Sequence, residues 1–531
     1  MKDEEFIERR IVTGLIISTE YLSSIRKIWK PILLNSSAAK LIAGWCIEFF
    51  DQYKAAPGKE IESISLNKTK GMKEENVNDI ESILESLSDE YERQDKFNVA
   101  YLVDQTIQYF DERNLREYVE DIKDALNGGN VADAKSKAYS YKPAVDIESM
   151  DLDLSSKDQL SAAIKKAFAT TSQPIVTYPK QLGEFLNPQL VRGAFIAFMG
   201  PEKRGKSFLL MDLAVRAARQ GANVAFFQAG DMSQDQQLKR ICIHLTGKSD
   251  QERYSGKMYE PVRDCIHNQL NTCGLKEREC DFGPFEGKDE NYVRGIIKKV
   301  KKGETEDDAK KPLLYKDLVE AVKKNPDYKP CFNCHKYWKS NWGAPWLKQI
   351  NTGEPLTVKG AEKALDKFFI KNKRRFRLSV HTSGTLTATQ METTLDLWER
   401  KDGFVADLIV VDFADIMASE YKGEFRHQEN DKWMKLRGLS QKRHALLATA
   451  TWTDSKSYDT NLLSLKNFSE DKRKYGHVTA MYGLNQNQRE KEIGIMRLNE
   501  IVIREDAFLN SNQVYVLQNL KRGLPCLSSY C

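Results

Sequence analysis

The fold is decided by the stretch Phe195-Ile196-Ala197-Phe198-Met199-Gly200-Pro201-Glu202-Lys203-Arg204-Gly205-Lys206-Ser207. An apolar run leads into the pattern G-x-x-x-x-G-K-S, and apolar residues at helical spacing follow it. Gly200 and Gly205 let the backbone turn tightly and point successive N–H groups at phosphate oxygens. A loop of this pattern between a strand and a helix is the phosphate-binding loop, or Walker A motif, of α/β nucleotide-binding proteins.

Two side chains of this loop are expected to act on a bound nucleotide. Lys206 supplies a positive charge for the β- and γ-phosphates, and the Ser207 hydroxyl is a ligand for Mg²⁺. The first turn of the following helix presents its positive end to the same phosphates. An ordinary glycine-rich turn with a solvated lysine is the alternative. The residues predicted to contact the nucleotide are Gly200, Pro201, Glu202, Lys203, Arg204, Gly205, Lys206, Ser207 and Phe208.

The composition is that of a globular protein with several domains. The chain has 531 residues, enough for roughly two to four domains, with 41% hydrophobic and 30% charged residues. It contains no apolar run long enough to cross a membrane, and its acidic start lacks the apolar core of a signal peptide. We therefore expect a cytoplasmic protein. The net charge is only +5, so contacts with nucleic acid must come from local basic patches.

Residues 1–145 are predicted to be helical, because apolar side chains recur at helical spacing, as at Ile7 and Ile11. The sequence Asn-Gly-Gly-Asn at 127–130 predicts the turn of a helical hairpin near the end of this part. We expect a domain for docking or oligomerisation, and a purely structural cap is the alternative. Residues 146–180 are polar and are predicted to form a linker that carries one short helix.

Residues 181–531 have the alternating strand and helix pattern of an α/β core. Two buried strands in this part lead to a carboxylate, one to Asp231 and the other, at 408–411, to Asp412. An apolar strand that places a carboxylate beside a phosphate-binding loop is the Walker B pattern, in which Asp412 would hold Mg²⁺, usually through water. The alternative is an ordinary aspartate in a turn at the end of a strand.

The cysteines gather in a long segment between the two motifs. Lys206 and Asp412 are 206 positions apart, which predicts an insertion at about 255–365. Five of the nine cysteines lie between positions 265 and 334, and the C-x-x-C pair at 331–334 can occupy two corners of a tetrahedral Zn²⁺ site. Reduced cysteines without a metal are the alternative. The predicted zinc ligands are Cys273, Cys280, Cys331 and Cys334, with Cys265 or His335 as substitutes.

A polar and basic stretch, 453–477, separates two apolar segments of the core, one ending at Trp452 and one starting at Val478. A mobile loop that faces a central channel would have this composition, and so would any solvated loop. Three predicted strands follow, at 478–484, 494–503 and 514–517. The basic residues of the stretch are Lys456, Lys466, Lys472, Arg473 and Lys474.

On these motifs the chain resembles the replicative hexameric helicases of the DnaB type, in a divergent form such as a bacteriophage encodes. The resemblance covers most of the chain except the insertion. It rests on 191–207, on F-F-Q-A-G-D-M-S at 226–233, on I-V-V-D-F at 409–413 and on 486–498. It implies an all-α N-terminal domain followed by an α/β RecA-like P-loop ATPase core, here with a cysteine-rich, zinc-binding insertion.

The resemblance also implies roles for two carboxylates. Asp231 stands where the family usually has the glutamate that polarises the attacking water. Asp412 stands at the family's Walker B position, where it would bind Mg²⁺. The family usually has a polar glutamine after the strand that here ends in Thr451 and Trp452, so the residue that senses the γ-phosphate differs in this chain.

By the same resemblance, Arg504 would be the arginine finger, with Arg497 and Arg522 as rivals. Such a finger reaches the γ-phosphate in the site of the neighbouring subunit and stabilises charge in the transition state. The family usually has a lysine two residues before the finger, where this chain has Val502. The catalytic set predicted on this basis is Lys206, Asp231, Asp412 and Arg504.

The function implied by the resemblance is that of an ATP-dependent DNA helicase that moves on single-stranded DNA and unwinds duplex at a replication fork. ATP, Mg²⁺ and a structural Zn²⁺ would be its cofactors. Its partners would be single-stranded and forked DNA, further copies in a homohexamer, and a primase or loader, in the cytoplasm of a host cell. Two alternatives stay open: a RecA-fold recombinase or regulatory DNA-binding ATPase without unwinding, and a nucleotide-binding scaffold with little turnover.

Overall fold

The computed structural model describes residues 2–26, 28–85, 98–139, 164, 173–276, 278–296, 311–333, 343–372, 375–458, 460–468, 472–504 and 509–530. The chain divides into two compact units, one made of 1–173 with 398–405, and the other of 174–397 with 406–531. Among the described residues, none of the helices has the length and apolar character that crossing a membrane requires.

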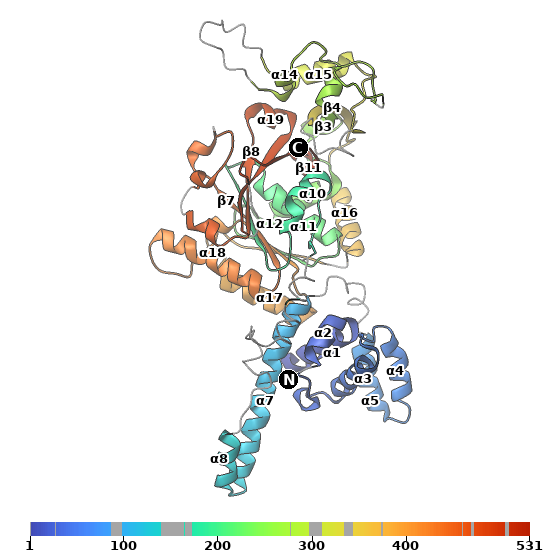
Figure 1. The fold of residues 1–531 in the computed structure, drawn as a ribbon, viewed down its shortest axis with the longest axis vertical. Helices are drawn as coiled ribbons and strands as arrows, with labels where there is room; N and C mark the ends of the chain where they lie inside the picture. Colours follow the sequence, from blue (N-terminus) through green and yellow to red (C-terminus); the bar gives the residue numbers. More distant parts are fainter. Residues whose placement is uncertain are drawn as a thin grey trace. The chain divides into compact units, whose positions relative to one another are not determined.

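The first unit is built from helices around its own apolar core, drawn in blue to cyan in Figure 1. Its helices are α1 (Lys2–Ile17), α2 (Thr19–Ile25), α3 (Ser37–Tyr53), α4 (Glu60–Lys68), α5 (Glu74–Glu85), α7 (Val99–Asn127) and α8 (Val131–Tyr139). The hairpin turn predicted at 127–130 lies between α7 and α8, and the helical N-terminal region is confirmed. Of the linker predicted at 146–180, only residue 164 and residues 173–180 are described, so its predicted short helix is not tested.

One buried carboxylate helps to fix this helical unit. Ser36 caps α3 by accepting from the backbone N–H of Ala39. The Glu8 carboxylate of α1 accepts from the Ser36 N–H at 2.8 Å and from the Tyr109 hydroxyl at 2.6 Å. Glu8 is almost fully buried, so these bonds replace the water that its charge has lost. They join α1 to the start of α3 and to α7.

The second unit is organised around a nine-stranded mixed sheet with the order β11-β10-β9-β8-β1-β7-β6-β2-β5. The six strands from β8 to β5 pair in parallel, and β9, β10 and β11 extend the sheet in antiparallel fashion. The strands are β1 (Phe195–Gly200), β2 (Val224–Gln228), β5 (Phe376–Val380), β6 (Leu408–Asp412), β7 (Leu446–Trp452), β8 (Ala480–Asn485), β9 (Ile495–Ile503), β10 (Gln513–Asn519) and β11 (Leu524–Tyr530).

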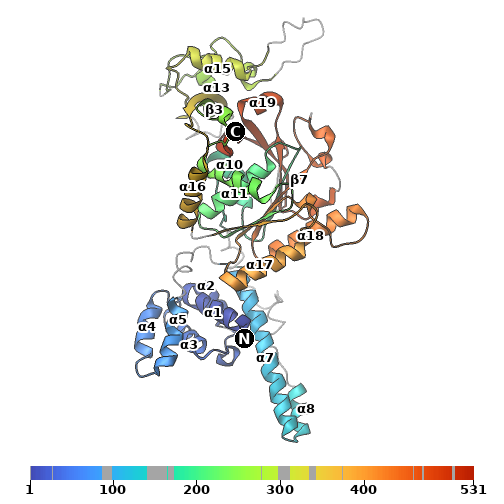
Figure 2. The ribbon, with the colours of Figure 1, turned by 180° about the vertical axis from the view of Figure 1, so that it is seen from behind.

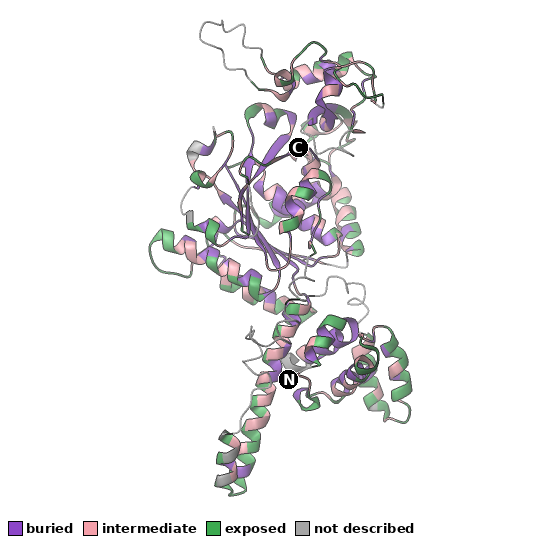
Figure 3. Cartoon of the chain, viewed as in Figure 1, coloured by how far each residue is buried: buried purple, intermediate pink, exposed green. Residues whose placement is uncertain are grey.

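Helices cover both faces of this sheet, so its central strands are buried throughout (Figure 3). Ile196 and Phe198 of β1 pack with α11, while Phe195 points the other way, toward Trp433 of α18. Figures 1 and 2 show α11 and α16 on one side of the sheet and α18 on the other. The helices are α10 (Lys180–Leu186), α11 (Lys206–Arg219), α12 (Gln234–Thr246), α16 (Val358–Lys371), α17 (Ala388–Asp402), α18 (Phe425–Lys442) and α19 (Gln488–Ile493).

The register of the sheet decides which residues meet at its carboxyl edge. Gly200 of β1 lies opposite Trp452 of β7, and Gln228 of β2 lies opposite Asp412 of β6. Since parallel strands all end at the same edge, the loops that follow them lie next to one another there. This edge carries both the phosphate-binding loop and the Walker B carboxylate.

The cysteine-rich segment forms a small lobe, yellow-green in Figure 1. β3 (Lys257–Cys265) pairs antiparallel with β4 (Gly343–Asn351), and α13 (Ile266–Gln269), α14 (Glu290–Arg294) and α15 (Tyr315–Lys324) lie between them in the chain. Phe285, Tyr328 and Trp346 pack in the core of the lobe. Helix α16, part of which falls inside the insertion predicted at about 255–365, packs on the main core through Phe368.

A buried carboxylate organises this lobe. Asp264 is fully buried, and its Oδ1 accepts from the backbone N–H of Cys331 at 2.9 Å. Its Oδ2 accepts from the Tyr328 hydroxyl at 2.8 Å and from the Gln269 amide at 3.0 Å. Burial raises the pKa of Asp264, and these donors oppose that shift. Asp264 thus joins the end of β3 to the first cysteine of the C-x-x-C pair.

Candidate nucleotide site

The phosphate-binding loop leaves β1 at Gly200 and enters α11 at Lys206. Gly205 has a φ of 87°, a left-handed conformation that favours glycine, and a Cβ placed there would lie 3.3 Å from Leu520 Cδ1. A Cβ at Gly200 would lie 3.2 Å from Leu484 Cβ. Both glycines of the motif therefore permit a backbone path that a larger residue would strain or crowd.

Lys206 is 7% exposed, and its ammonium group donates to the backbone carbonyls of Gly200 at 2.7 Å and Pro201 at 2.9 Å. Burial lowers the pKa of Lys206 to about 8, and the charge of Asp415 is the strongest of those that oppose the shift. The ammonium group is therefore held inside the loop by two weak, neutral acceptors. Phosphate oxygens would be stronger, charged acceptors at the same place.

Asp412, the last residue of β6, is 1% exposed, and its Oδ1 accepts a hydrogen bond of 2.9 Å from Ser207 Oγ. Burial raises the pKa of Asp412 to about 6, while the Ser207 bond and the Arg240 charge oppose the rise. When the Gln228 amide is assigned so that its nitrogen donates, that nitrogen lies 3.1 Å from Asp412 Oδ2. The carboxylate is thus held between the P-loop helix and β2.

These oxygen atoms fit a magnesium ion. Mg²⁺ prefers one or two protein oxygens together with water and phosphate oxygens, and a serine hydroxyl with an aspartate is a usual pair in P-loop sites. Ser207 Oγ and Asp412 Oδ1 already lie 2.9 Å apart.

Asp231 follows β2 in the turn that precedes α12. Gly230 in this turn has a φ of 115°, and a Cβ there would lie 2.1 Å from the backbone nitrogen of Ser383, so glycine is required. Asp231 itself is exposed, and its charge contributes to the raised pKa of Asp412. The structure therefore brings the two predicted carboxylates to the same edge as the phosphate-binding loop.

Arg240 belongs to this site but was not identified from the sequence. Its guanidinium carbon lies 4.6 Å from the centre of the Phe208 ring, a cation–π distance. Burial lowers the pKa of Arg240, and the charges of Asp412 and Asp231 oppose the shift. In the structure Arg240 lies three residues after the buried Gln237 on α12, so the two share one face of the helix, and no local pattern in the sequence marks that face.

Asp415 is a second residue that the sequence did not reveal. It lies in the short helix η8 (Ala414–Ile416), and its Oδ2 accepts from the Trp452 N–H and the Thr451 hydroxyl, both at 2.8 Å. Its Oδ1 accepts from the Lys474 ammonium at 2.8 Å. A buried carboxylate therefore lies at the end of β7, close to the position where the family that this chain resembles usually has a polar glutamine.

The three arginines proposed as fingers differ in their surroundings. Arg497 is 5% exposed and bonds to Glu490 at 2.7 Å, and Arg522 donates to the Gly247 carbonyl at 2.7 Å. Arg504 is exposed at the end of β9, where its guanidinium donates to the Gly476 carbonyl. All three arginines thus bond within the chain, but Arg497 is buried and Arg504 is exposed.

The predicted zinc ligands are not brought together among the residues that the structure describes. Within those residues, no group of three or more His, Cys, Asp or Glu side chains could hold a metal ion. Cys265 and Cys331 are buried, and the Cys280 sulfur accepts from the Lys329 N–H at 3.0 Å. Cys334 and the substitute His335 fall outside the described residues, so the zinc site stays a prediction.

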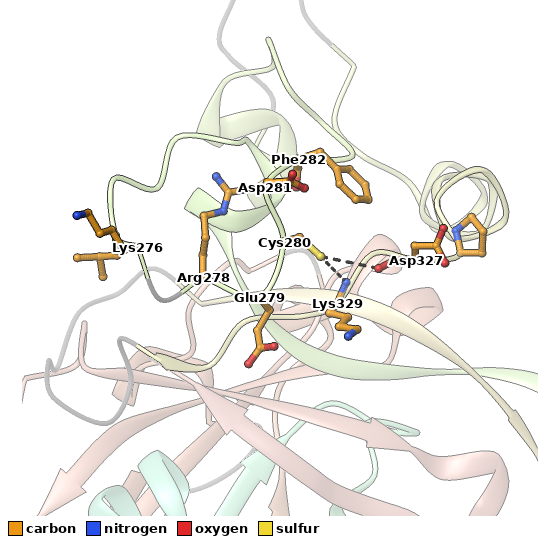
Figure 4. A pocket seen from close by; sticks show the side chains of 10 residues that line it. Lys276, Arg278, Glu279, Cys280, Asp281, Phe282, Asp327 and Lys329 are labelled. Carbon is orange, nitrogen blue, oxygen red and sulfur yellow. Dashed lines mark hydrogen bonds between the residues drawn. The ribbon is translucent and has the colours of Figure 1, made fainter.

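A surface pocket of about 840 Å³ lies beside Cys280 in the same lobe (Figure 4). The Cys280 sulfur points toward the backbone of Lys329 and Asp327. The other charged residues around the pocket are Lys276, Arg278, Glu279 and Asp281. Both signs of charge are mixed around it, which favours no particular class of ligand.

The sequence matches no protein-family model and no curated protein. Solved structures do match the fold. A DnaB-like replicative helicase, described with its interactions with primase, aligns over 99% of this chain and 100% of that chain, with 9% identity and a TM-score of 0.43. A second solved structure, described as an ATPase domain, aligns over 71% of this chain and 100% of that chain, also with 9% identity and a TM-score of 0.43. At such identities residue roles must come from the geometry of this chain itself.

Proposed function

We propose that this chain hydrolyses MgATP and uses the reaction to move along single-stranded DNA and to separate duplex at a replication fork. The observation that carries the hydrolytic part is the 2.9 Å contact between Ser207 Oγ and Asp412 Oδ1, beside the buried Lys206 ammonium. Together they supply the hydroxyl, the carboxylate and the cation that hydrolysis of a nucleotide at a P-loop needs.

In this proposal Lys206 leaves the loop carbonyls and binds the β- and γ-phosphates. Asp231 orients a water molecule and accepts its proton while the water oxygen bonds to the γ-phosphorus. The bond from that phosphorus to the β,γ-bridging oxygen breaks, and ADP leaves with the bonding electrons. Ser207 and Asp412 would hold Mg²⁺, which would supply positive charge to the phosphate oxygens.

The site needs a second subunit in this proposal. Arg504 is exposed, and once released from the Gly476 carbonyl its guanidinium would reach a nucleotide bound by a neighbouring copy. A guanidinium placed at the γ-phosphate stabilises the charge that develops there. A closed ring, a homohexamer by the resemblance in the sequence, would complete each site in this way.

The segment 453–477 is the proposed contact with DNA. Among its described residues, Lys466, Arg473 and the aromatic rings of Tyr458 and Tyr475 are exposed. Basic side chains bind phosphates and aromatic rings stack on bases without regard to sequence, which suits movement along a strand. A primase or a loader is the protein partner proposed from the resemblance.

Two assays test the proposal on the full-length protein. ATP hydrolysis should be stimulated by oligo(dT) and should be lost in Lys206→Ala, while Lys239→Ala, which removes an exposed lysine paired with Asp250, should behave as the wild type. The wild type should also displace a strand from a forked duplex. Stimulated hydrolysis without strand displacement would instead favour a recombinase or regulatory ATPase, and absence of hydrolysis would favour a nucleotide-binding scaffold.

A further inference from the structure

A buried ion pair lies between the Walker B region and the proposed DNA segment. Lys474 belongs to η11 (Lys472–Gly476), and its side chain is 1% exposed although its neighbours Arg473 and Tyr475 are exposed. The Lys474 ammonium lies 2.8 Å from Asp415 Oδ1 and 3.2 Å from Glu429 Oε2. Lys474 thus ties this segment to two buried carboxylates, and Arg473 also holds it through a bond to the Arg426 carbonyl of α18.

The pair reaches the phosphate-binding loop through a continuous set of contacts. Asp415 accepts from the Trp452 N–H, and Trp452 lies opposite Gly200 in the pairing of β7 with β1. The Gly200 carbonyl in turn accepts from the Lys206 ammonium at 2.7 Å. A phosphate that draws Lys206 away from this carbonyl would therefore change the charge balance around Asp415.

A second lysine, Lys432, shares Glu429 with Lys474 and also holds the η8 backbone. The Lys432 ammonium donates to the backbone carbonyls of Asp415 at 3.1 Å and Met417 at 3.2 Å, and it pairs with Glu429. Asp415 also bonds to β7 through the Thr451 hydroxyl and the Trp452 N–H, and neither bond involves Lys474. The η8 turn therefore does not need Lys474 for its shape, and the ion pair serves chiefly to join the 472–476 segment to the site.

We propose that Asp415 is a positioning residue that connects the phosphate site to the DNA segment through Lys474, so that single-stranded DNA on this segment accelerates ATP hydrolysis. The inference rests on the proposed function. When DNA displaces the segment, Lys474 moves with it, and the strength of its pairing with Asp415 changes. Asp415 passes this change to the end of β7 and to the surroundings of Lys206.

The test compares the rate of ATP hydrolysis at saturating oligo(dT) with the rate without DNA. In the wild type this ratio should be well above one. In Lys474→Met it should fall at least about fivefold, which is the lower end of typical coupling between sites. Asp415→Asn keeps an oxygen for the Trp452 N–H but loses the charge that binds Lys474, so the same fall is expected. In the double variant the two losses should not add, because each substitution removes the same interaction, the ion pair between Lys474 and Asp415.

Lys442→Met is the matched control, since it removes the exposed ion pair with Glu392 at the far end of α18 and should leave the ratio unchanged. Thermal unfolding and oligo(dT) affinity are measured for every variant, so that loss of fold or of DNA binding is recognised. If Lys474→Met and Asp415→Asn both keep the wild-type ratio of rates with and without DNA, the inference is wrong but the proposed function stands. A wild-type ratio of one would overturn the proposed function and the inference with it.

Discussion

Ser207 Oγ and Asp412 Oδ1 lie 2.9 Å apart, although 205 positions separate them in the chain. The first turn of α11 carries Ser207, and the end of β6 carries Asp412. β7 lies between β1 and β6 in the sheet, so the contact spans one intervening strand. The order of the strands is what brings this hydroxyl and this buried carboxylate together.

Replacing Asp412 with asparagine should separate nucleotide binding from hydrolysis. The amide cannot supply the negative charge that Mg²⁺ needs, but the loop N–H groups and Lys206 still bind phosphates. We expect hydrolysis to fall by about 100-fold or more, while ATP affinity measured without Mg²⁺ changes little. Hydrolysis rates and nucleotide titrations over a range of Mg²⁺ concentrations measure both effects. Unchanged dependence on Mg²⁺ would remove Asp412 from the metal site.

Gly205→Ala should disable the loop at a modest cost in stability. Its φ of 87° strains alanine by about 1–2 kcal/mol, and the added Cβ would crowd Leu520 Cδ1. Gly193→Ala is a matched control, because Gly193 has a φ of 71° and open space around its Cβ position. Both variants should lose stability in thermal denaturation, and Gly205→Ala should lose at least as much as Gly193→Ala. Only Gly205→Ala should lose nucleotide binding, and equal binding losses would show that strain alone is responsible.

Local signals account for the parts of the site that the sequence predicted. These signals are short patterns that can be recognised without knowing which segments they contact. They are the buried run 195–200, the two glycines of the loop and the apolar strand before Asp412. The later strands β8, β9 and β10 were predicted in the same way. β11 was missed, because Pro525, Cys526 and two serines interrupt any apolar pattern, and its pairing with β10 at the edge of the sheet is non-local.

The residues that the sequence did not reveal depend on contacts between distant segments. Arg240 is one of many basic residues until α12 places it over Phe208. Lys474 looked like part of a solvated basic loop, and only the structure shows it buried against Asp415. Burial of a charge is set by what packs around it, and the order of residues in one segment does not contain that information.

The stability of the core should fall in mild acid because of His244. Burial lowers the pKa of His244, although Asp212 and the Gly523 carbonyl oppose the shift. In the unfolded chain the pKa is near 6.5, so below that pH the unfolded state binds a proton that the folded state resists. The free energy of unfolding should therefore fall as the pH drops through 6.5, by at most about 1.4 kcal/mol per pH unit.

Thermal unfolding midpoints between pH 5 and 8 measure this effect. His244→Gln retains a donor for the Gly523 carbonyl, which lies 2.6 Å from His244 Nδ1, but cannot take up a proton. Its midpoint should fall less steeply than that of the wild type below pH 6.5. His427→Gln, at an exposed position of α18, should follow the wild type. If the unfolding midpoints of the wild type and His244→Gln fall in parallel as the pH drops, His244 is not the cause of the loss of stability in acid.

Mixing two inactive variants tests whether Arg504 acts between subunits. Arg504→Ala should bind ATP but hydrolyse it about 1,000-fold more slowly, which is the lower range for loss of an arginine finger. Lys206→Ala should be inactive for a different reason, since its own site lacks the lysine while its Arg504 is intact. In mixed rings a Lys206→Ala subunit can supply Arg504 to the site of an Arg504→Ala subunit. The mixture should therefore hydrolyse ATP faster than either variant alone.

Arg26→Ala is the control for this mixing experiment. It breaks an exposed ion pair with Asp51 in the helical unit and should be as active as the wild type. If the mixture stays as inactive as its parts, Arg504 does not complete a neighbouring site. Each site must then find its second cation within its own chain, where the charges of both carboxylates act on Arg240.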